Sequence, residues 1–193
     1  MVEWLLEELK IPYTRNVIDL FSGYTKSKEY LSIHPLGSVP ALIVNGIPHI
    51  ESLAMMLFLA DSHPEAKLSP QLATPYRITY LQWMVYCTAT IEPTLGPTFV
   101  RSLSRPLTER KNTATEKEIE AFHRTLAPLN EAMFNQAILP TGFSAVDVLL
   151  STELYWADQV GLVSRHSTAS GYLQKMMSRP AFQICQARET EGI

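Results

Sequence analysis

The sequence predicts an α/β domain followed by an all-α domain. Strand signals occur only in the first 62 residues, where Asn45-Gly46 separates two apolar runs, which is the strongest short-range signal of a β-hairpin. Beyond residue 73, apolar residues recur at three- and four-residue spacing, which is typical of helices. We therefore expect an α/β domain over 1–62, a linker over 63–73 and a helical domain over 74–193.

Composition limits the classes of protein to consider. The chain has 193 residues and a net charge of −3, which gives no electrostatic footprint for nucleic acid or an anionic membrane. Acidic residues within the first apolar stretch argue against a signal peptide, and the apolar run 53–60 is too short to span a bilayer. The two cysteines, Cys87 and Cys185, match no metal or redox spacing, so we expect no metal site and a reducing compartment, the cytoplasm.

The expected elements of the first domain follow the order α-β-α-β-β-α. Residues 2–10 form a helix with one apolar face, and Pro12 ends it. A strand is expected over 15–20 and a short helix or turn over 24–32. Pro40 starts the first strand of the hairpin, since it lacks an N–H, and Ser52 is the expected N-cap of the next helix.

The second domain is expected to contain only helices. A long helix covers 74–99, with kinks expected at its two prolines, and a loop covers 101–112. Capping boxes at Thr115/Glu118 and Ser144/Asp147 open the next two helices, the second of which is apolar on nearly every face and should be the buried central helix. Two final helices cover 172–178 and 180–187, where Pro180 suits the first turn.

Three motifs of this chain resemble the glutathione S-transferases. Val39-Pro40 followed by the hairpin and Glu51-Ser52 resembles the glutathione-binding half of their thioredoxin-like domain. Residues 143–147 and 178–182 resemble parts of their C-terminal helical domain. The resemblance implies a thioredoxin-like N-terminal domain, without its first strand, followed by the helical transferase domain.

The resemblance also implies roles for single residues. Val39 would pair its backbone with the cysteinyl part of glutathione beside a cis Pro40, while Glu51 would bind the ammonium group and Ser52 the carboxylate of the γ-glutamyl end. A helix N-terminus favours an anion, so this assignment is chemically sensible. Ser38 stands where the family often has lysine or glutamine, and His34 where it usually has asparagine; as a loop residue before proline, His34 is more readily explained as structural.

The resemblance leaves the residue that activates the thiol unassigned. In the family, a strand and loop ahead of the first helix carry that serine, tyrosine or cysteine, and here Met1 already falls at the helix start. The hypotheses are a start upstream, a rearranged strand pairing or partner chain in its place, or lost catalysis. Ser22, Tyr24 and Tyr13 are possible donors outside the family's position, and Cys87 fits a small core residue better than a reactive thiol.

The expected activity is attack of a glutathione thiolate on a small electrophilic molecule, by conjugation, isomerisation or sulfur donation. The acceptor pocket should lie between the domains, with Tyr86, Thr90 and Arg101 on its wall; for Tyr86 and Thr90, helix packing explains their position equally well. The family is usually homodimeric, with the helices beginning near Ser52 and Thr74 facing the partner. The alternative is a non-catalytic binding or regulatory module on the same fold.

Overall fold

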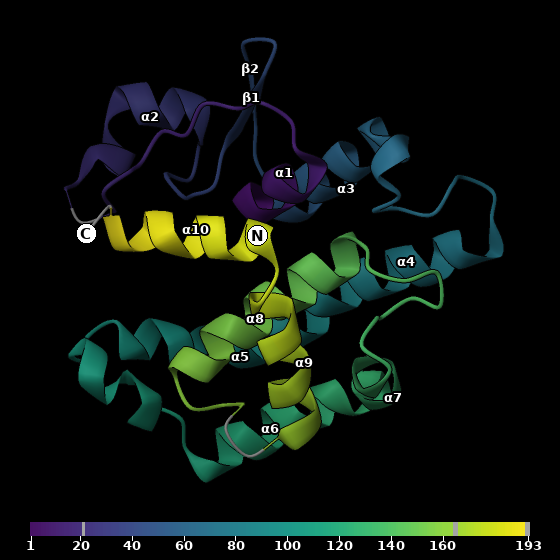
Figure 1. Ribbon diagram of the computed structural model, residues 1–193. Coiled ribbons are helices and arrows are strands. Elements are labelled where there is room, and N and C mark those ends of the chain that lie inside the picture. Colours follow the sequence, from purple (N-terminus) through teal and green to yellow (C-terminus); the bar gives the residue numbers. More distant parts are fainter. Residues whose placement is uncertain (21, 164–165, 192–193) are drawn as a thin grey trace.

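The computed structural model describes residues 1–20, 22–163 and 166–191 (Figure 1). The N-terminal part contains α1 (Val2–Leu9), η1 (Tyr24–Lys26), α2 (Lys28–Ile33), β1 (Leu42–Val44), β2 (Ile47–His49) and α3 (Ser52–Ser62). The helical part contains η2 (Pro64–Ala66), α4 (Pro75–Tyr86), η3 (Cys87–Ile91), α5 (Glu92–Ser102), η4 (Leu107–Asn112), α6 (Glu116–Leu126), η5 (Ala127–Leu129), α7 (Asn130–Phe134), α8 (Ala145–Gln159), α9 (Ser167–Met177) and α10 (Pro180–Glu191). Residues 192–193, the last two of the predicted helical domain, lie outside the described residues.

The predicted hairpin is confirmed. Asn45 and Gly46 have φ of 52° and 79°, the two positive values that a tight type I′ turn requires. β1 and β2 pair antiparallel, with Leu42 opposite His49 and Val44 opposite Ile47. Within the described residues, this sheet contains two strands.

The strand predicted over 15–20 is wrong. This segment is irregular, and its apolar side chains are largely exposed, with Val17 62% and Leu20 54% accessible. Residues 14–16 and 40–45 both line a groove of about 690 Å³ and are not paired as strands. A strand needs a hydrogen-bonded neighbour within about 4.8 Å, and no described strand provides one for this segment.

The helix predicted over 74–99 is interrupted in the structure. α4 passes into η3, a π-helical turn, and α5 then extends to Ser102, so Arg101 is helical and not part of a loop. The cause lies in Pro93, which cannot donate an N–H and whose ring would clash with the carbonyl four residues earlier, inside η3. In place of the expected kink, Pro93 thus follows a π-helical turn, while Pro97 lies inside α5 without ending it.

The helices after α5 begin at the predicted capping boxes and at Pro180, but two of their boundaries differ from the prediction. Both capping boxes are formed, at Thr115/Glu118 and at Ser144/Asp147. The helix that Thr115 opens ends at Leu126 and is followed by η5 and α7, because Pro128 interrupts the helical hydrogen bonds there. α9 begins at Ser167, earlier than expected, and α10 begins at Pro180 as expected.

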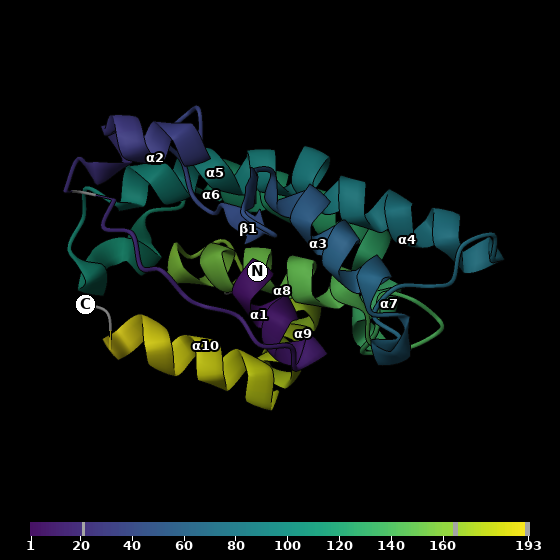
Figure 2. The ribbon, with the colours of Figure 1, turned by 90° about the horizontal axis from the view of Figure 1, so that it is seen from above.

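The buried core connects the two parts of the chain. α8 is central and contacts α4, α5 and α9 as well as α1 and α3 (Figure 2). α10 returns from the helical part to lie beside α1. Arg179 joins them, since its guanidinium donates to both carboxylate oxygens of Glu8 at 2.6 and 2.8 Å and stacks 3.5 Å from the ring centre of Phe143.

Candidate glutathione-binding site

The loop that leads into β1 is held by contacts to η1 and α2. The hydroxyl of Tyr30, which is buried, donates to the carbonyl oxygen of Ser38 at 2.8 Å, and Lys26 donates to the carbonyl of Leu36 at 3.3 Å. Gly37 has φ of 62°, and a Cβ there would lie 2.3 Å from the backbone oxygen of Thr25. These contacts fix the position of the loop immediately before Val39.

His34 lies inside this loop. Its side chain is buried, and its Nδ1 accepts the backbone N–H of Leu36 at 3.3 Å. Its carbonyl accepts the N–H of Gly37 at 2.8 Å. These contacts support a structural role for His34 in shaping the turn.

The Val39–Pro40 peptide bond is cis. Val39 is 43% exposed, and Ser38 is exposed beside it. Val39 and Pro40 line a cavity of about 740 Å³, together with Tyr24 and Tyr30 from the N-terminal helices. The backbone ahead of the proline is therefore accessible beside an open cavity.

Glu51 and Ser52 lie at the start of α3, which begins one residue earlier than expected. Ser52 is the first helical residue, and Glu51 occupies the N-cap position with φ of 69° and makes no capping hydrogen bond with its side chain. The carbonyl of Glu51 accepts the N–H of Met55 at 3.1 Å, so the N–H groups of the preceding residues have no partner within the helix. This helix start offers N–H donors and partial positive charge to an anion.

The hairpin register brings these two regions to one end of the sheet. Leu42 lies opposite His49, and continuing the antiparallel register places Pro40 opposite Glu51. The two pairs that were found in the sequence, Val39-Pro40 and Glu51-Ser52, therefore lie at the same open end of the hairpin.

Glu92 is a further acidic residue that the sequence did not single out. It is half-buried at the start of α5, and burial, followed by the negative charge of Glu51, raises the pKa of its carboxyl. Two carboxylates that repel one another favour a cation between them. No local pattern marks this residue, because the proximity of α5 to the start of α3 is a property of the tertiary fold.

Three hydroxyl groups were considered as activators of a thiol, and the structure separates them. The Tyr13 hydroxyl donates to Glu7 at 2.6 Å and accepts from Arg188 at 2.5 Å, so other groups already occupy it. Ser22 is exposed and donates to the carbonyl of Asp19 at 2.8 Å. Tyr24 alone of the three lines the cavity beside Val39.

The hydroxyl of Tyr24 is suited to donate a hydrogen bond. A tyrosine hydroxyl is protonated near neutral pH, and desolvation, followed by the charge of Glu29 and a hydrogen bond to its carboxylate, raises the pKa of Tyr24 further. Cys87 differs, because burial, followed by the charge of Glu153, raises its thiol pKa well above the usual range. A thiol in that state is a poor nucleophile and fits a core residue.

The residues predicted to line the acceptor pocket lie on η3 and near the ends of α4 and α5. The Tyr86 hydroxyl donates to the carbonyl of Thr125 at 2.9 Å, and Arg101 pairs with Glu118 at 2.8 and 2.9 Å. Thr90 is half-buried in η3. The polar groups of Tyr86 and Arg101 thus hold helices together, and their place on an acceptor pocket stays a prediction.

Comparisons with known proteins agree with this arrangement. A family model described as "Glutathione S-transferase, N-terminal domain" matches residues 1–62. Glutathione S-transferase GstA of Escherichia coli O157:H7 is 29% identical over 168 residues, covering 86% of this chain and 79% of the relative.

Solved structures share the fold over nearly the whole chain. A glutathione transferase from Methylococcus capsulatus superposes with a TM-score of 0.82 at 24% identity and covers 98% of this chain and 92% of the other. A sphingomonad glutathione S-transferase, solved in complex with glutathione, gives a TM-score of 0.76 at 24% identity and covers 100% of this chain and 93% of the other.

The fold and the comparisons define a protein with a thioredoxin-like domain, whose sheet has two strands in the residues that the structure describes, and a mostly helical remainder. Residues 1–62 match the N-terminal domain family of the glutathione S-transferases, and the chain as a whole is similar to members of that superfamily. Within the part of the chain that the structure describes, no helix is long and apolar enough to cross a membrane.

Proposed function

We propose that the protein is a glutathione transferase, an enzyme that uses the thiolate of glutathione as a nucleophile toward a small electrophilic molecule. The observation that carries the proposal is the placement of Val39-Pro40 and Glu51-Ser52 at one end of the hairpin, beside an accessible cavity. Relatives named glutathione S-transferase support an enzyme, and nothing in the comparisons favours a non-catalytic module.

The cysteinyl and γ-glutamyl parts of glutathione each have a chemically matched partner in this site. The backbone of Val39 faces the cysteinyl unit, and the hydroxyl of Ser52 with the N–H groups at the start of α3 binds the γ-glutamyl carboxylate. Glu51 binds the ammonium group, and Glu92 adds a second negative charge nearby. Ser38, which is uncharged, and the buried His34 shape the loop that leads to the glycine end.

Tyr24 is the proposed activator of the sulfur. A hydroxyl that donates to the thiolate lowers the thiol pKa by stabilising the anion. The thiol releases its proton to water, the resulting thiolate attacks the electrophilic carbon, a carbon–sulfur bond forms, and the leaving group departs with the electron pair of the broken bond. The Tyr24 proton stays on the hydroxyl throughout.

Two measurements test the proposal. Titration calorimetry with reduced glutathione should show binding to the wild type, and a loss of about tenfold or more in affinity for Ser52→Ala and for Glu51→Gln, because each removes a charge-assisted contact. The second measurement follows, by absorbance, the rate at which glutathione displaces chloride from 1-chloro-2,4-dinitrobenzene and forms the conjugate. This rate should fall in Tyr24→Phe while the affinity for glutathione stays the same. Absence of glutathione binding to the wild type would exclude the proposal, whereas binding without conjugation with a panel of electrophiles would support the non-catalytic alternative.

The assembly belongs to the same proposal. We expect a homodimer in the cytoplasm, with α3 and α4 at the interface and with domains over 1–62 and 74–193 joined by the linker 63–73. Ile78 and Val85, seven residues apart on one face of α4, are 68% and 51% exposed, which supports an apolar contact there. Analytical ultracentrifugation should show a dimer for the wild type and a monomer for Ile78→Glu.

A further inference from the structure

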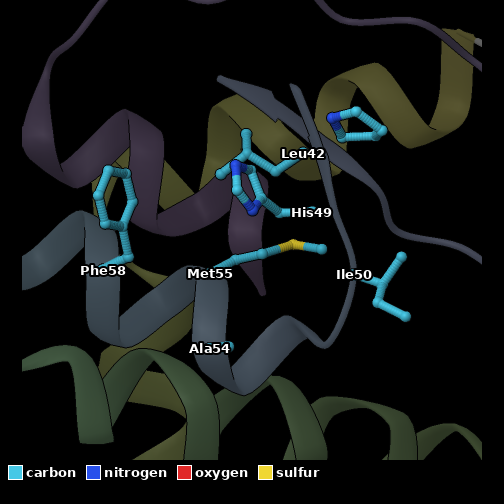
Figure 3. Close-up of a pocket in the computed structure, with 7 residues that line it drawn as sticks. Leu42, His49, Ile50, Ala54, Met55 and Phe58 are labelled. Carbon is cyan, nitrogen blue, oxygen red and sulfur yellow. The ribbon is translucent and has the colours of Figure 1, made fainter. Parts of the chain in front are cut away.

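Two of the five histidines of the chain contact one another in the helical part. His123 lies on α6 and His166 directly precedes α9, and their ring centres are 4.9 Å apart with an angle of 89° between the ring planes. The other three histidines lie in the N-terminal part. His34 is buried in the loop before β1, His63 ends α3, and His49 lines a cavity of about 440 Å³ between the hairpin and α3, as Figure 3 shows.

Each ring of the pair also holds a segment of backbone. Nε2 of His123 donates to the carbonyl oxygen of Leu162, beyond the end of α8, at 2.8 Å. Nδ1 of His166 accepts the backbone N–H of Ala169 at 3.3 Å, so the neutral ring carries its proton on Nε2. The pair therefore joins three segments, which are α6, the chain after α8 and the start of α9.

His166 is the N-cap residue of α9. The N–H groups in the first turn of a helix have no partner within the helix, and an acceptor side chain at the N-cap satisfies one of them. The residues that usually serve there, serine, threonine, asparagine and aspartate, do not titrate near neutral pH, whereas an imidazole does. The cap of α9 is therefore one that a proton can remove.

Protonation of His166 would change three interactions at once. The added proton occupies Nδ1, so the ring no longer accepts the N–H of Ala169. The new positive charge faces the partial positive charge of the helix N-terminus and lies beside His123. Burial, followed by the charge of His123, lowers the pKa of His166, which is the direction that these contacts require.

The charge that acts on His166 comes from α6. α9 packs against α7, α8 and α10. The charged side chains on those three helices include Glu131, Asp147, Glu153, Asp158, Arg188 and Glu189. Lys175 lies in the last turn of α9, and Glu120 and Arg124 flank His123 on α6. Of all the charged groups that the structure describes, His123 is the one whose charge shifts the pKa of His166.

We infer that the contact between His123 and His166 makes the start of α9 sensitive to mild acid: the neutral ring of His166 caps the helix, and its protonation releases the cap and loosens the first turn. α9 also carries Tyr172, which is buried and donates to Asp147 of the α8 capping box at 2.6 Å, so the order of α9 matters to α8. This device is independent of the proposed glutathione function.

The sign of the pH dependence follows from the lowered pKa. The unfolded chain takes up the proton more readily than the folded protein does. The stabilisation by the cap is therefore complete above the unfolded pKa of about 6.5 and is lost as pH falls toward the lower folded pKa.

A titration of the histidine ring signals by NMR tests the environment of His166 in the full-length protein. His166→Asn identifies its signal as the one that is missing, and asparagine keeps an acceptor at the N-cap. The midpoint of His166 should lie below 6.5 in the wild type. His123→Gln keeps an N–H donor for Leu162 and removes the neighbouring ring and its charge, so the midpoint should rise.

Amide exchange measured by NMR tests the cap itself. The protection of the Ala169 N–H should fall about fivefold between pH 7 and pH 5 in the wild type and should stay constant in His166→Asn. The N–H of Glu118 is the internal control, because it occupies the same position in α6 and is bonded to the Thr115 hydroxyl at 3.4 Å. That hydroxyl does not titrate, and Arg101 holds the pKa of the Glu118 carboxyl at about 2, so this protection should not change.

Three results would each overturn the inference. They are a His166 midpoint at or above 6.5, unchanged protection of Ala169 in the wild type, and an equal fall in protection in His166→Asn. If His166→Asn does not fold, His166→Asp takes its place, because an aspartate caps a helix and stays ionised at pH 5.

Discussion

The hydroxyl of Tyr30 donates a 2.8 Å hydrogen bond to the carbonyl oxygen of Ser38 and thereby connects α2 to the residue before Val39. Tyr30 is 3% exposed, so removing its hydroxyl leaves a carbonyl oxygen without this partner in a partly dry environment. The bond thus couples the packing of α2 to the position of the backbone that we propose contacts glutathione.

Tyr30→Phe should therefore lower both stability and glutathione affinity. We expect a loss of about 1 kcal/mol in the free energy of unfolding, and an affinity for glutathione reduced about fivefold as the loop becomes less well positioned. Urea denaturation and titration calorimetry measure the two effects. Tyr76→Phe, at a partly exposed tyrosine of α4, serves as the control and should change neither quantity.

Glu51 combines an unfavourable backbone conformation with a proposed binding role. Its φ of 69° is uncommon for a residue other than glycine, and such a conformation costs about 1–3 kcal/mol. Glu51→Gly should keep or raise the free energy of unfolding, because glycine adopts this conformation without strain and is tolerated at an N-cap. The same change should weaken glutathione binding about tenfold, because the carboxylate is lost.

The matched variant Glu51→Gln separates these two effects. It keeps the strained backbone and removes only the charge, so its affinity should fall as in Glu51→Gly while its stability does not increase. Thermal denaturation together with calorimetry compares the three proteins. Tighter glutathione binding in Glu51→Gly than in the wild type would contradict the assigned role.

Gly37 is required by the close approach of its loop to η1. In Gly37→Ala the new Cβ would lie 2.3 Å from the Thr25 oxygen, and the φ of 62° disfavours any side chain, so we expect a loss of about 2 kcal/mol or more. Gly171→Ala in α9 is the matched control, since its Cβ meets nothing within 4 Å. There the same substitution should stabilise the protein by up to about 1 kcal/mol, because alanine favours a helix. Urea denaturation of both variants measures the contrast.

Local chemistry explains the features that the sequence predicted correctly. The hairpin depends on Asn45-Gly46, and two helix starts depend on residues three positions apart, so short-range patterns specify them. The strand predicted over 15–20 was wrong for the opposite reason, since an apolar stretch becomes a strand only where a neighbour can pair with it.

The site was predictable in part for the same reason. Val39-Pro40 and Glu51-Ser52 are each local motifs, and the hairpin between them sets their separation. The proximity of Glu92 to Glu51 and the hydrogen bond from Tyr30 to Ser38 depend on how distant elements pack, and a single sequence contains no local pattern that predicts such packing. The cavity beside His49 is equally non-local, because its walls come from two strands and a helix.

Burial of Glu153 in α8 should make the stability of the protein depend on pH. The apolar character of α8 predicts a buried helix, and Glu153 lies within it with 0% exposure and no hydrogen-bond partner for either carboxylate oxygen in the described structure. Burial, followed by the charge of Glu92, raises the pKa of this carboxyl well above its usual 4.5. The folded protein therefore holds Glu153 in its neutral form over a pH range in which the unfolded chain ionises it.

The sign of the pH dependence follows from this difference. A group whose folded pKa is raised contributes stability that is complete below the unfolded pKa and is lost as pH rises toward the folded pKa. The contribution of Glu153 to the free energy of unfolding should fall above about pH 4.5, by at most about 1.4 kcal/mol for each pH unit. Glu153→Gln has a similar shape and cannot ionise, so it should be more stable than the wild type at pH 8, with the difference shrinking toward pH 4.5. Urea denaturation across this pH range measures the effect. Glu131→Gln, at an exposed acid of α7, is the control. A difference in stability between the wild type and Glu153→Gln that does not depend on pH would show that Glu153 is not held neutral.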